Sequence, residues 1–311
     1  MIAKESRPAK IRPVSELKTI EFKYRLVFCV YKYLMDFFNF KNLETEGFVV
    51  VKNFLDSADL KQLKINFELS YQQPRSNKNY NTIPSLAVHN LDDKIKSLLS
   101  TVTQTTDISV NWITPKGVFF ATNEVKFDWH QDHEPFWWAQ DSYNHLNFWM
   151  PVIKPDPLSS GLSIIPFSRL LSADRELTTK YILKRGATRY KISDDSTTIL
   201  DDNTGLKHRL NIDISSIAVE PKVDVGDLII LRGDVIHRTQ DTDNLRVSLG
   251  IRCYNNESIL LREKFVRGSR LKRTMIEQNQ ITYQFLIDQF IHQGKKSVQL
   301  SELLKYQGDL Q

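Results

Sequence analysis

Hydrophobic and polar positions follow two different periods along the chain. In the first hundred residues the apolar positions recur with helical spacing, which predicts helices over residues 15–39, 57–71 and 92–100. Ser57 is the expected N-cap of the second helix, with Asp59 in its first turn. A short strand is expected at residues 47–51. The region 14–105 is therefore predicted to be mainly helical.

From residue 108 to residue 255 the pattern changes to short β-rich segments that are separated by turn residues. About eight strands at such spacing predict a double-sheet jelly roll, that is, a cupin-like double-stranded β-helix. The expected strands cover residues 108–114, 117–122, 126–132, 145–152, 162–166, 227–231, 235–239 and 246–254.

Two further regions depart from this strand rhythm. Residues 168–223 form a polar stretch, which we expect to be an insertion of the kind that often serves as a lid or binding loop. After residue 255 the helical period returns, and a one-sided apolar stripe that includes Phe285 and Phe290 predicts a helical region over 257–307. Without an internal repeat or a low-complexity linker, residues 1–311 are expected to form one mainly β (α+β) domain with flanking helices.

The composition is typical of a globular enzyme, with 41% hydrophobic and 25% charged residues. Cys29 and Cys253 are the only cysteines and have no paired spacing, so a disulfide framework is not expected. Charged residues interrupt the most apolar early segment, residues 22–38, and no secretory signal is evident. We therefore expect a cytoplasmic protein with no transmembrane segment.

The net charge of +5 is concentrated in one short segment, because six basic residues stand against Glu263 within residues 262–273. Such a cluster is most often a solvated helix face. The alternative is a contact for phosphate on a substrate, a nucleic acid or a membrane lipid. The basic members are Arg262, Lys264, Arg267, Arg270, Lys272 and Arg273.

His130 and Asp132 are two residues apart in an expected strand, so both side chains project from the same face. A His-x-acid pair alone is weak, since seven histidines and 37 acidic residues in 311 produce about one by chance. His237 strengthens it, because two imidazoles and one carboxylate form the facial triad of non-haem Fe(II) oxygenases. Each histidine alone would more often be an ordinary hydrogen-bonded residue.

The strand after His237 carries a candidate anion-binding residue. Alternation places Arg246, Ser248 and Arg252 on one face of the strand over 246–254. An arginine that points into a barrel needs an anion, and its planar fork suits a carboxylate such as the distal one of 2-oxoglutarate. A structural ion pair with a nearby aspartate is the alternative. Thr239, two residues after His237, places a hydroxyl beside the same site.

These motifs together resemble the phytanoyl-CoA dioxygenase-like family of Fe(II)/2-oxoglutarate-dependent dioxygenases. The resemblance covers roughly residues 108–255 and, more weakly, residues 46–70. Two details depart from the family pattern: Pro166-Phe-Ser-Arg169 replaces its usual Pro-Gly-Ser-His turn, and the His237-to-Arg246 interval is about two residues shorter. The matching segments are Trp129–Asp132, Asn147–Val152, Ser160–Ser168, the Gly226–Asp227 turn, His237 and Arg246.

The resemblance implies His130, Asp132 and His237 as iron ligands and catalytic residues, and Arg246 as the anchor of 2-oxoglutarate. It further implies that Thr239 and Trp149 line the cosubstrate pocket, and it matches Trp112 to that pocket by spacing alone. The implied cofactors are Fe(II), 2-oxoglutarate and O2. The implied reaction hydroxylates or otherwise oxidises a small-molecule or acyl-type substrate while 2-oxoglutarate is decarboxylated to succinate.

Aromatic residues are dense around the expected metal strand, and most of them are expected to pack the core. Phe136, Trp138 and Arg252 are the candidates for contact with the substrate. Because Asp132 is present, hydroxylation is favoured over halogenation, in which related enzymes lack the carboxylate ligand.

Two other functions are compatible with parts of this pattern. The spacing of Arg246 and Arg252 matches that of AlkB-like nucleic-acid demethylases, with the 262–273 cluster as a phosphate contact. The long separation of His130 from His237 and the motifs at Trp149 and Gly161 disfavour nucleic acid. The second alternative is a non-catalytic jelly roll that serves as a binding module, which the intact triad disfavours.

Overall fold

A computed structural model of the chain describes residues 39–72, 81–82, 91–240 and 244–303. From Phe40 onward these residues belong to one compact unit. Nearly all of the helix expected over 15–39, and Cys29 with it, lies outside the described residues. Within the described ranges, no helix has both the length and the apolar character that a bilayer crossing requires.

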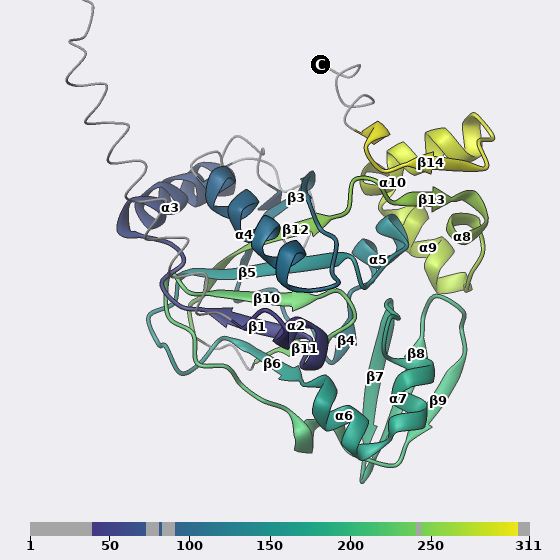
Figure 1. Cartoon of the computed structure of the whole chain (residues 1–311), viewed down its shortest axis with the longest axis horizontal. Coiled ribbons are helices and arrows are strands. Elements are labelled where there is room, and N and C mark those ends of the chain that lie inside the picture. Colours follow the sequence, from purple (N-terminus) through teal and green to yellow (C-terminus); the bar gives the residue numbers. More distant parts are fainter. Residues whose placement is uncertain (1–38, 73–80, 83–90, 241–243, 304–311) are drawn as a thin grey trace, which may run out of the picture. The chain divides into compact units, whose positions relative to one another are not determined.

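Two six-stranded antiparallel sheets form the core (Figure 1). The first sheet has the order β1 (Phe48–Val51), β10 (Leu228–Arg232), β5 (His145–Ile153), β12 (Val247–Tyr254), β3 (Trp112–Thr122) and β2 (Asn81–Thr82). The second sheet has the order β6 (Leu162–Ile165), β11 (Ile236–Thr239), β4 (His130–Gln131), β7 (Thr188–Ser193), β8 (Ser196–Asp201) and β9 (Lys207–Leu210).

The chain crosses from one sheet to the other at each step from β3 to β6 and again at each step from β9 to β12. Strands β3, β5, β10 and β12 belong to the first sheet, and β4, β6 and β11, which alternate with them in the sequence, belong to the second. This alternation is the double-stranded β-helix that the strand spacing predicts. The jelly-roll fold class is confirmed.

A turn at Gly226 and Asp227 starts β10 and ties it to β1. Gly226 has φ +94°, and a Cβ there would lie 3.0 Å from the carbonyl oxygen of Leu55, so a larger residue would be strained. The Asp227 carboxylate accepts hydrogen bonds from Lys52 Nζ and from the main-chain nitrogen of Asn53. These contacts fix the position of the first residues of β10, the strand that precedes β11 in the chain.

The N-terminal helices are α2 (Asn42–Thr45), α3 (Ser57–Tyr71) and α4 (Asp92–Thr105). The N-cap of α3 is Asp56, so the expectation of Ser57 was wrong. The Asp56 carboxylate accepts from the nitrogens of Ala58 and Asp59, and Asp59 accepts in return from the Asp56 nitrogen. This reciprocal capping box makes Ser57 the first helical residue.

Three of the expected strands, over 108–114, 117–122 and 126–132, differ from those observed. Residues 112–122 form one continuous strand, β3, whose break in register with β12 is confined to an irregularity between Ile251 and Cys253. The strand expected over 126–132 is reduced to His130–Gln131. Side chains hold the preceding residues instead: the Thr239 hydroxyl bonds both the nitrogen and the oxygen of Phe127, and Arg246 donates to the Val125 oxygen.

The 168–223 insertion is built from regular elements. It contains α6 (Phe167–Ala173), α7 (Arg175–Tyr181), the strands β7 to β9 and a short 3-10 helix (Ile214–Ile217). Because β7 pairs with β4, the insertion extends the second sheet as a three-stranded ribbon. Tyr190, Ile199 and Leu210 supply buried side chains on one face of this ribbon, which explains why a polar stretch forms strands.

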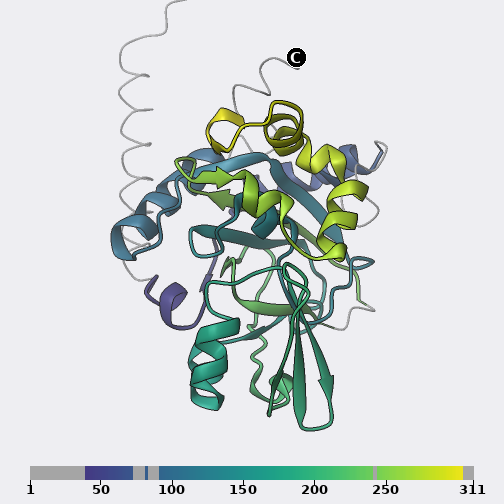
Figure 2. The ribbon, with the colours of Figure 1, turned by 90° about the vertical axis from the view of Figure 1, so that its right-hand side faces the viewer.

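After β12 the chain forms a mainly helical region, which Figure 2 shows in yellow-green and yellow. A second hydrophobic cluster includes Trp137 and Trp138 of the short helix α5 (Glu134–Ala139) and Tyr283 and Phe285. The elements are β13 (Ile259–Leu261), α8 (Arg262–Val266), α9 (Arg270–Gln278), α10 (Gln280–Ile287), a π-helical turn (Asp288–His292) and β14 (Ser297–Gln299).

Candidate metal centre

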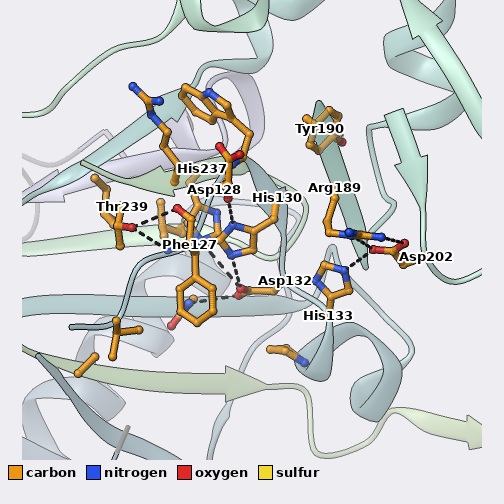
Figure 3. Close-up of a pocket in the computed structure, with 18 of the residues that line it drawn as sticks. Phe127, Asp128, His130, Asp132, His133, Arg189, Tyr190, Asp202, His237 and Thr239 are labelled. Atoms are coloured by element: carbon orange, nitrogen blue, oxygen red, sulfur yellow. Dashed lines mark hydrogen bonds and ion pairs between the residues drawn. The ribbon is translucent and has the colours of Figure 1, made fainter. Parts of the chain in front are cut away.

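His130, Asp132 and His237 converge in space although 107 positions separate the first from the last. His130 and His237 are direct partners on the adjacent strands β4 and β11, with ring centroids 4.4 Å apart. One ligand atom from each of the three residues lies within 4.8 Å of the others. Asp132 Oδ1 is 3.6 Å from His130 Nε2 and 3.9 Å from His237 Nε2. Figure 3 shows this convergence.

Main-chain carbonyls orient both imidazoles. His130 Nδ1 lies 2.7 Å from the oxygen of Asp128, and His237 Nδ1 lies 3.1 Å from the oxygen of Val235. Since a carbonyl only accepts, each Nδ1 carries a proton, and each Nε2 faces Asp132. This is the arrangement that fixes histidines as metal ligands.

The protonation of the site suits a cation. Burial lowers the pKa of His237 to about 4, and the neighbouring His130 acts in the same direction, so His237 is neutral at pH 7. Burial by itself raises the pKa of Asp132, but its interactions with His130, His237 and Arg252 outweigh this and hold that pKa well below its usual value. The cluster therefore presents two imidazoles, of which that of His237 is neutral, and one carboxylate, the donor set that fits a non-haem ferrous ion.

Asn147 and Gln131 show how the surrounding strands support the cluster. Asn147 Nδ2 donates to Asp132 Oδ2 at 3.2 Å, which leaves Oδ1 facing the histidines. Gln131 points the opposite way, as strand alternation predicts, and donates to the carbonyl oxygens of Ile182 and Asp234 in the core. Metal-facing and core-facing side chains thus alternate through residues 130–132.

A cavity of about 1590 Å³ opens over the cluster and contains Arg246 in its lining. The Arg246 side chain is 1% exposed and donates to the carbonyl oxygens of Ser160, Thr122 and Val125. Burial lowers its pKa to about 10, so it remains charged at pH 7. Among the described residues no carboxylate pairs with it, and its Nε has no hydrogen-bond partner there. A buried cation with this surplus donor fits an anionic ligand.

The cavity brings together most of the residues that the sequence singled out. Trp149, Thr239 and Arg252 line it with Arg246 and the three metal-site residues. The Arg252 guanidinium lies over the Phe119 ring, 4.9 Å from its centroid. The Thr239 hydroxyl bonds Phe127, so it positions the segment before His130 as well as lining the cavity.

Three predicted residues lie elsewhere. Trp138 is buried in the C-terminal hydrophobic cluster with its ring against Tyr254, and Phe136 and Trp112 pack against the same cluster. None of the three belongs to the cavity lining. Their placement as pocket residues is therefore corrected. Phe136 and Trp138 of helix α5 thus pack against residues that are distant in the sequence, which the local sequence does not reveal.

The sequence interpretation missed one wall of the cavity. Arg189 and Lys191 of β7 and Asp202 after β8 line it, and so do residues of α9. Asp202 accepts from Arg189 Nε and Nη2 and lies 2.9 Å from His133 Nε2, as Figure 3 shows. A register prediction for β7 could have found Arg189, because it pairs directly with His130.

The 262–273 basic cluster is only partly a solvated face. Lys272 is 3% exposed and donates to Asn203 Oδ1 and to the carbonyl oxygens of Lys264 and Arg267. Burial lowers the pKa of Lys272 to about 8. This lysine joins α8 and α9 to the turn after β8, whereas the other basic residues of the cluster are exposed.

Comparisons with known proteins give only distant similarity. No family model matches the chain, and no curated protein matches it. The phytanoyl-CoA dioxygenase-like resemblance therefore stays a prediction.

Three solved structures illustrate the similarity that exists. The non-heme alpha ketoglutarate dependent carbocyclase SnoK from nogalamycin biosynthesis is 11% identical, with 70% of this chain and 83% of that chain covered and a TM-score of 0.45. EctD from S. alaskensis with 2-oxoglutarate and 5-hydroxyectoine is 13% identical, covering 71% and 76%, with a TM-score of 0.45. A Pseudomonas putida prolyl-4-hydroxylase is 14% identical, covering 69% and 96%, with a TM-score of 0.41. Similarity at this level carries no argument about activity.

Proposed function

We propose that this chain is an Fe(II)- and 2-oxoglutarate-dependent oxygenase that hydroxylates or otherwise oxidises a small-molecule or acyl-type substrate. The observation that carries the proposal is the cluster of His130, Asp132 and His237, with both Nδ1 atoms held by carbonyls and both Nε2 atoms directed at one carboxylate oxygen. Three protein ligands on one side of an ion leave positions open for cosubstrate and O2.

Arg246 supports the cosubstrate assignment. It is a buried guanidinium in the same cavity, and the described residues supply it with carbonyl acceptors but no carboxylate. In the proposal the distal carboxylate of 2-oxoglutarate accepts from Arg246, with Trp149 and Thr239 as neighbouring walls. Carboxylate pairing with a fixed arginine is directional, so it would also set the orientation of the cosubstrate.

The residues of the chain have separate tasks in this reaction. Bound iron and 2-oxoglutarate would supply the oxidising chemistry, with O2 consumed and succinate and CO2 released. His130, Asp132 and His237 would hold the metal, and Asn147 would orient the carboxylate ligand. The apolar walls around Trp129, Trp149 and Phe127 would exclude water and hold the substrate carbon near the metal.

The test measures Fe(II) affinity by titration under argon and succinate formation from 2-oxoglutarate in air. Wild-type protein is expected to bind one ferrous ion and release succinate, and His237→Ala should lower both by at least about 100-fold, since outer-sphere losses alone reach that size. The matched control is His208→Ala, because His208 lies on β9 against Tyr181 and outside the cavity lining.

A wild-type protein that binds no ferrous ion and forms no succinate would contradict the proposal and favour a non-catalytic jelly roll. Equal losses in His237→Ala and His208→Ala would also contradict it, because a general fold defect would then explain both.

A further inference from the structure

The face of the second sheet that carries the metal ligands continues beyond them as a charged surface. His237 pairs with His130, and His130 pairs with Arg189 on β7. Directly paired residues of antiparallel strands share a face, so Arg189 lies on the ligand face, one strand farther out. Lys191 is two residues along β7 and therefore lies on the same face.

The two cations differ in what they contact. The Asp202 carboxylate accepts hydrogen bonds from Nε and from one terminal nitrogen of the Arg189 guanidinium. Lys191 is exposed, and within the part of the chain that the structure describes its side-chain ammonium has no hydrogen bond or ion pair. Its cross-strand partner is the neutral Thr198. Lys191 is thus a free ammonium group that lines the cavity of the metal cluster.

The cavity as a whole has a positive balance. Its lining contains five cationic and three acidic side chains of described residues. Two of the three carboxylates already have partners, because Asp132 belongs to the metal cluster and Asp202 pairs with Arg189. The charges of a bound divalent metal and of 2-oxoglutarate, which carries two negative charges, would cancel. The excess of positive charge on the cavity walls would then favour an additional anion.

Helix α9 adds apolar side chains to the cavity wall. Leu271 and Met275 are one turn apart on α9 and line the cavity with Gln278 and Asn279, so one face of this helix points inward. The N-terminus of α9 is fixed on the turn after β8, because Ser269 donates through its nitrogen to Asn203 and through its hydroxyl to Asp202. Leu271 remains 38% exposed, which is a surplus of apolar surface within the cavity.

We infer that the substrate is an amphipathic organic anion whose carboxylate or phosphate binds Lys191 beside Arg189 while its apolar part lies along Leu271 and Met275. Strands lie about 4.8 Å apart and alternate residues about 6.7 Å apart, so the anionic group would lie on the order of 10 Å from the metal ligands. This inference rests on the proposed function, whose cavity it uses.

The experiment uses full-length protein loaded with Fe(II) and 2-oxoglutarate under argon. Calorimetry below the micellar range compares decyl phosphate, decanoate, decyltrimethylammonium and decanol. We expect at least one of the anions to bind about tenfold or more tightly than the cation, and whichever anion is preferred identifies a phosphate or carboxylate substrate.

Lys191→Gln should weaken the preferred anion about tenfold and leave decanol binding unchanged, whereas Leu271→Ser should weaken both. Lys61→Gln on the exposed face of α3 is the matched control and should leave all four affinities unchanged. Equal binding of anion and cation, or an anion affinity that Lys191→Gln does not alter, would overturn the inference.

The two proposals fail in different ways. Succinate formation without any preference for anions would leave the oxygenase assignment intact and reject the substrate class. Preference for anions that depends on Lys191, in a protein that forms no succinate, would retain the anion site and reject the oxygenase.

Discussion

The metal-bearing strands and the β7–β9 ribbon belong to one sheet, but the arginine–aspartate ion pairs of the two regions differ in their exposure to solvent. In the turn from β10 to β11, Arg232 and Asp234 form a bidentate ion pair whose side chains are 5% and 0% exposed. In the ribbon, Arg189 forms the same kind of pair with Asp202, yet its side chain is 53% exposed. The jelly roll fixes geometry by burial, whereas the ribbon keeps charge accessible to a ligand.

The sharpest way to break this comparison is to remove the buried carboxylate. Asp234→Asn leaves the Arg232 charge buried without a counter-charge between the rings of Tyr143 and Phe167. Losing one partner of a buried pair costs about 3–5 kcal/mol, so we expect a large fall in the free energy of unfolding in urea. A loss below about 1 kcal/mol would mean that burial does not govern this pair.

A second test uses His145, a buried histidine of the jelly roll. Burial lowers the pKa of His145 to about 4, and the ring stacks on Tyr254 at 4.7 Å. Between pH 6.5 and 4 the unfolded chain takes up a proton that the folded chain does not, so the folded state loses stability as the pH falls. The loss approaches about 3 kcal/mol from this group.

The measurement is urea unfolding of the metal-free protein at pH 8 and pH 5. His145→Leu should show a smaller difference in unfolding free energy between the two pH values than wild type. An unchanged difference would show that His145 is not the group responsible.

How much the sequence could predict differs between the same two regions. Strand spacing predicted the jelly roll, and alternation placed His130 and Asp132 on one face, because period-2 patterns encode which face a side chain occupies. His237 was added because its imidazole completes the donor set of a facial triad. Alternation singled out Arg246 and Thr239, the resemblance added Trp149, and all three line the cavity. Each lies in a strand or directly before one, where local pattern and tertiary position agree.

The ribbon and α9 were not predicted because their place depends on pairing over long distances. Nothing near Arg189 in the sequence shows that β7 adds to the edge of β4, and nothing in α9 shows that Leu271 lines the cavity. For the same reason Phe136 and Trp138 were assigned to the cavity although they pack against the C-terminal helices. Hydrophobic pattern identifies buried faces, but it does not say which partner buries them.

A third prediction separates support of the metal site from support of the fold. Asn147→Ala removes the donor to Asp132 Oδ2 and should lower Fe(II) affinity about 10–100-fold, the usual cost of losing an outer-sphere partner. Asn144→Ala is the control, because Asn144 bonds Asp141 and the nitrogen of Ser109 and lies outside the cavity lining. Equal effects of the two changes on Fe(II) affinity would contradict a specific role for Asn147.

The smallest expected effect comes from the exposed partner of the ribbon pair. Arg189→Gln removes a guanidinium that is half in solvent, and exposed ion pairs contribute about 0–1 kcal/mol, so the free energy of unfolding should change little. Asp202 still accepts from His133, which keeps that carboxylate paired. Fe(II) affinity should also stay near that of wild type, because among the described residues the Arg189 side chain bonds Asp202 and none of the three ligands.

Comparing Arg189→Gln with Asp234→Asn tests whether burial accounts for the difference between the ion pairs of the two regions. If Arg189→Gln costs as much stability as Asp234→Asn, the Arg189–Asp202 pair stabilises the fold as strongly as the buried Arg232–Asp234 pair does. The function of the ribbon pair would then be structural rather than ligand binding. If stability and Fe(II) affinity both hold while the affinity for anionic probes falls, the ribbon contributes its charge to binding and the jelly roll contributes its burial to the metal.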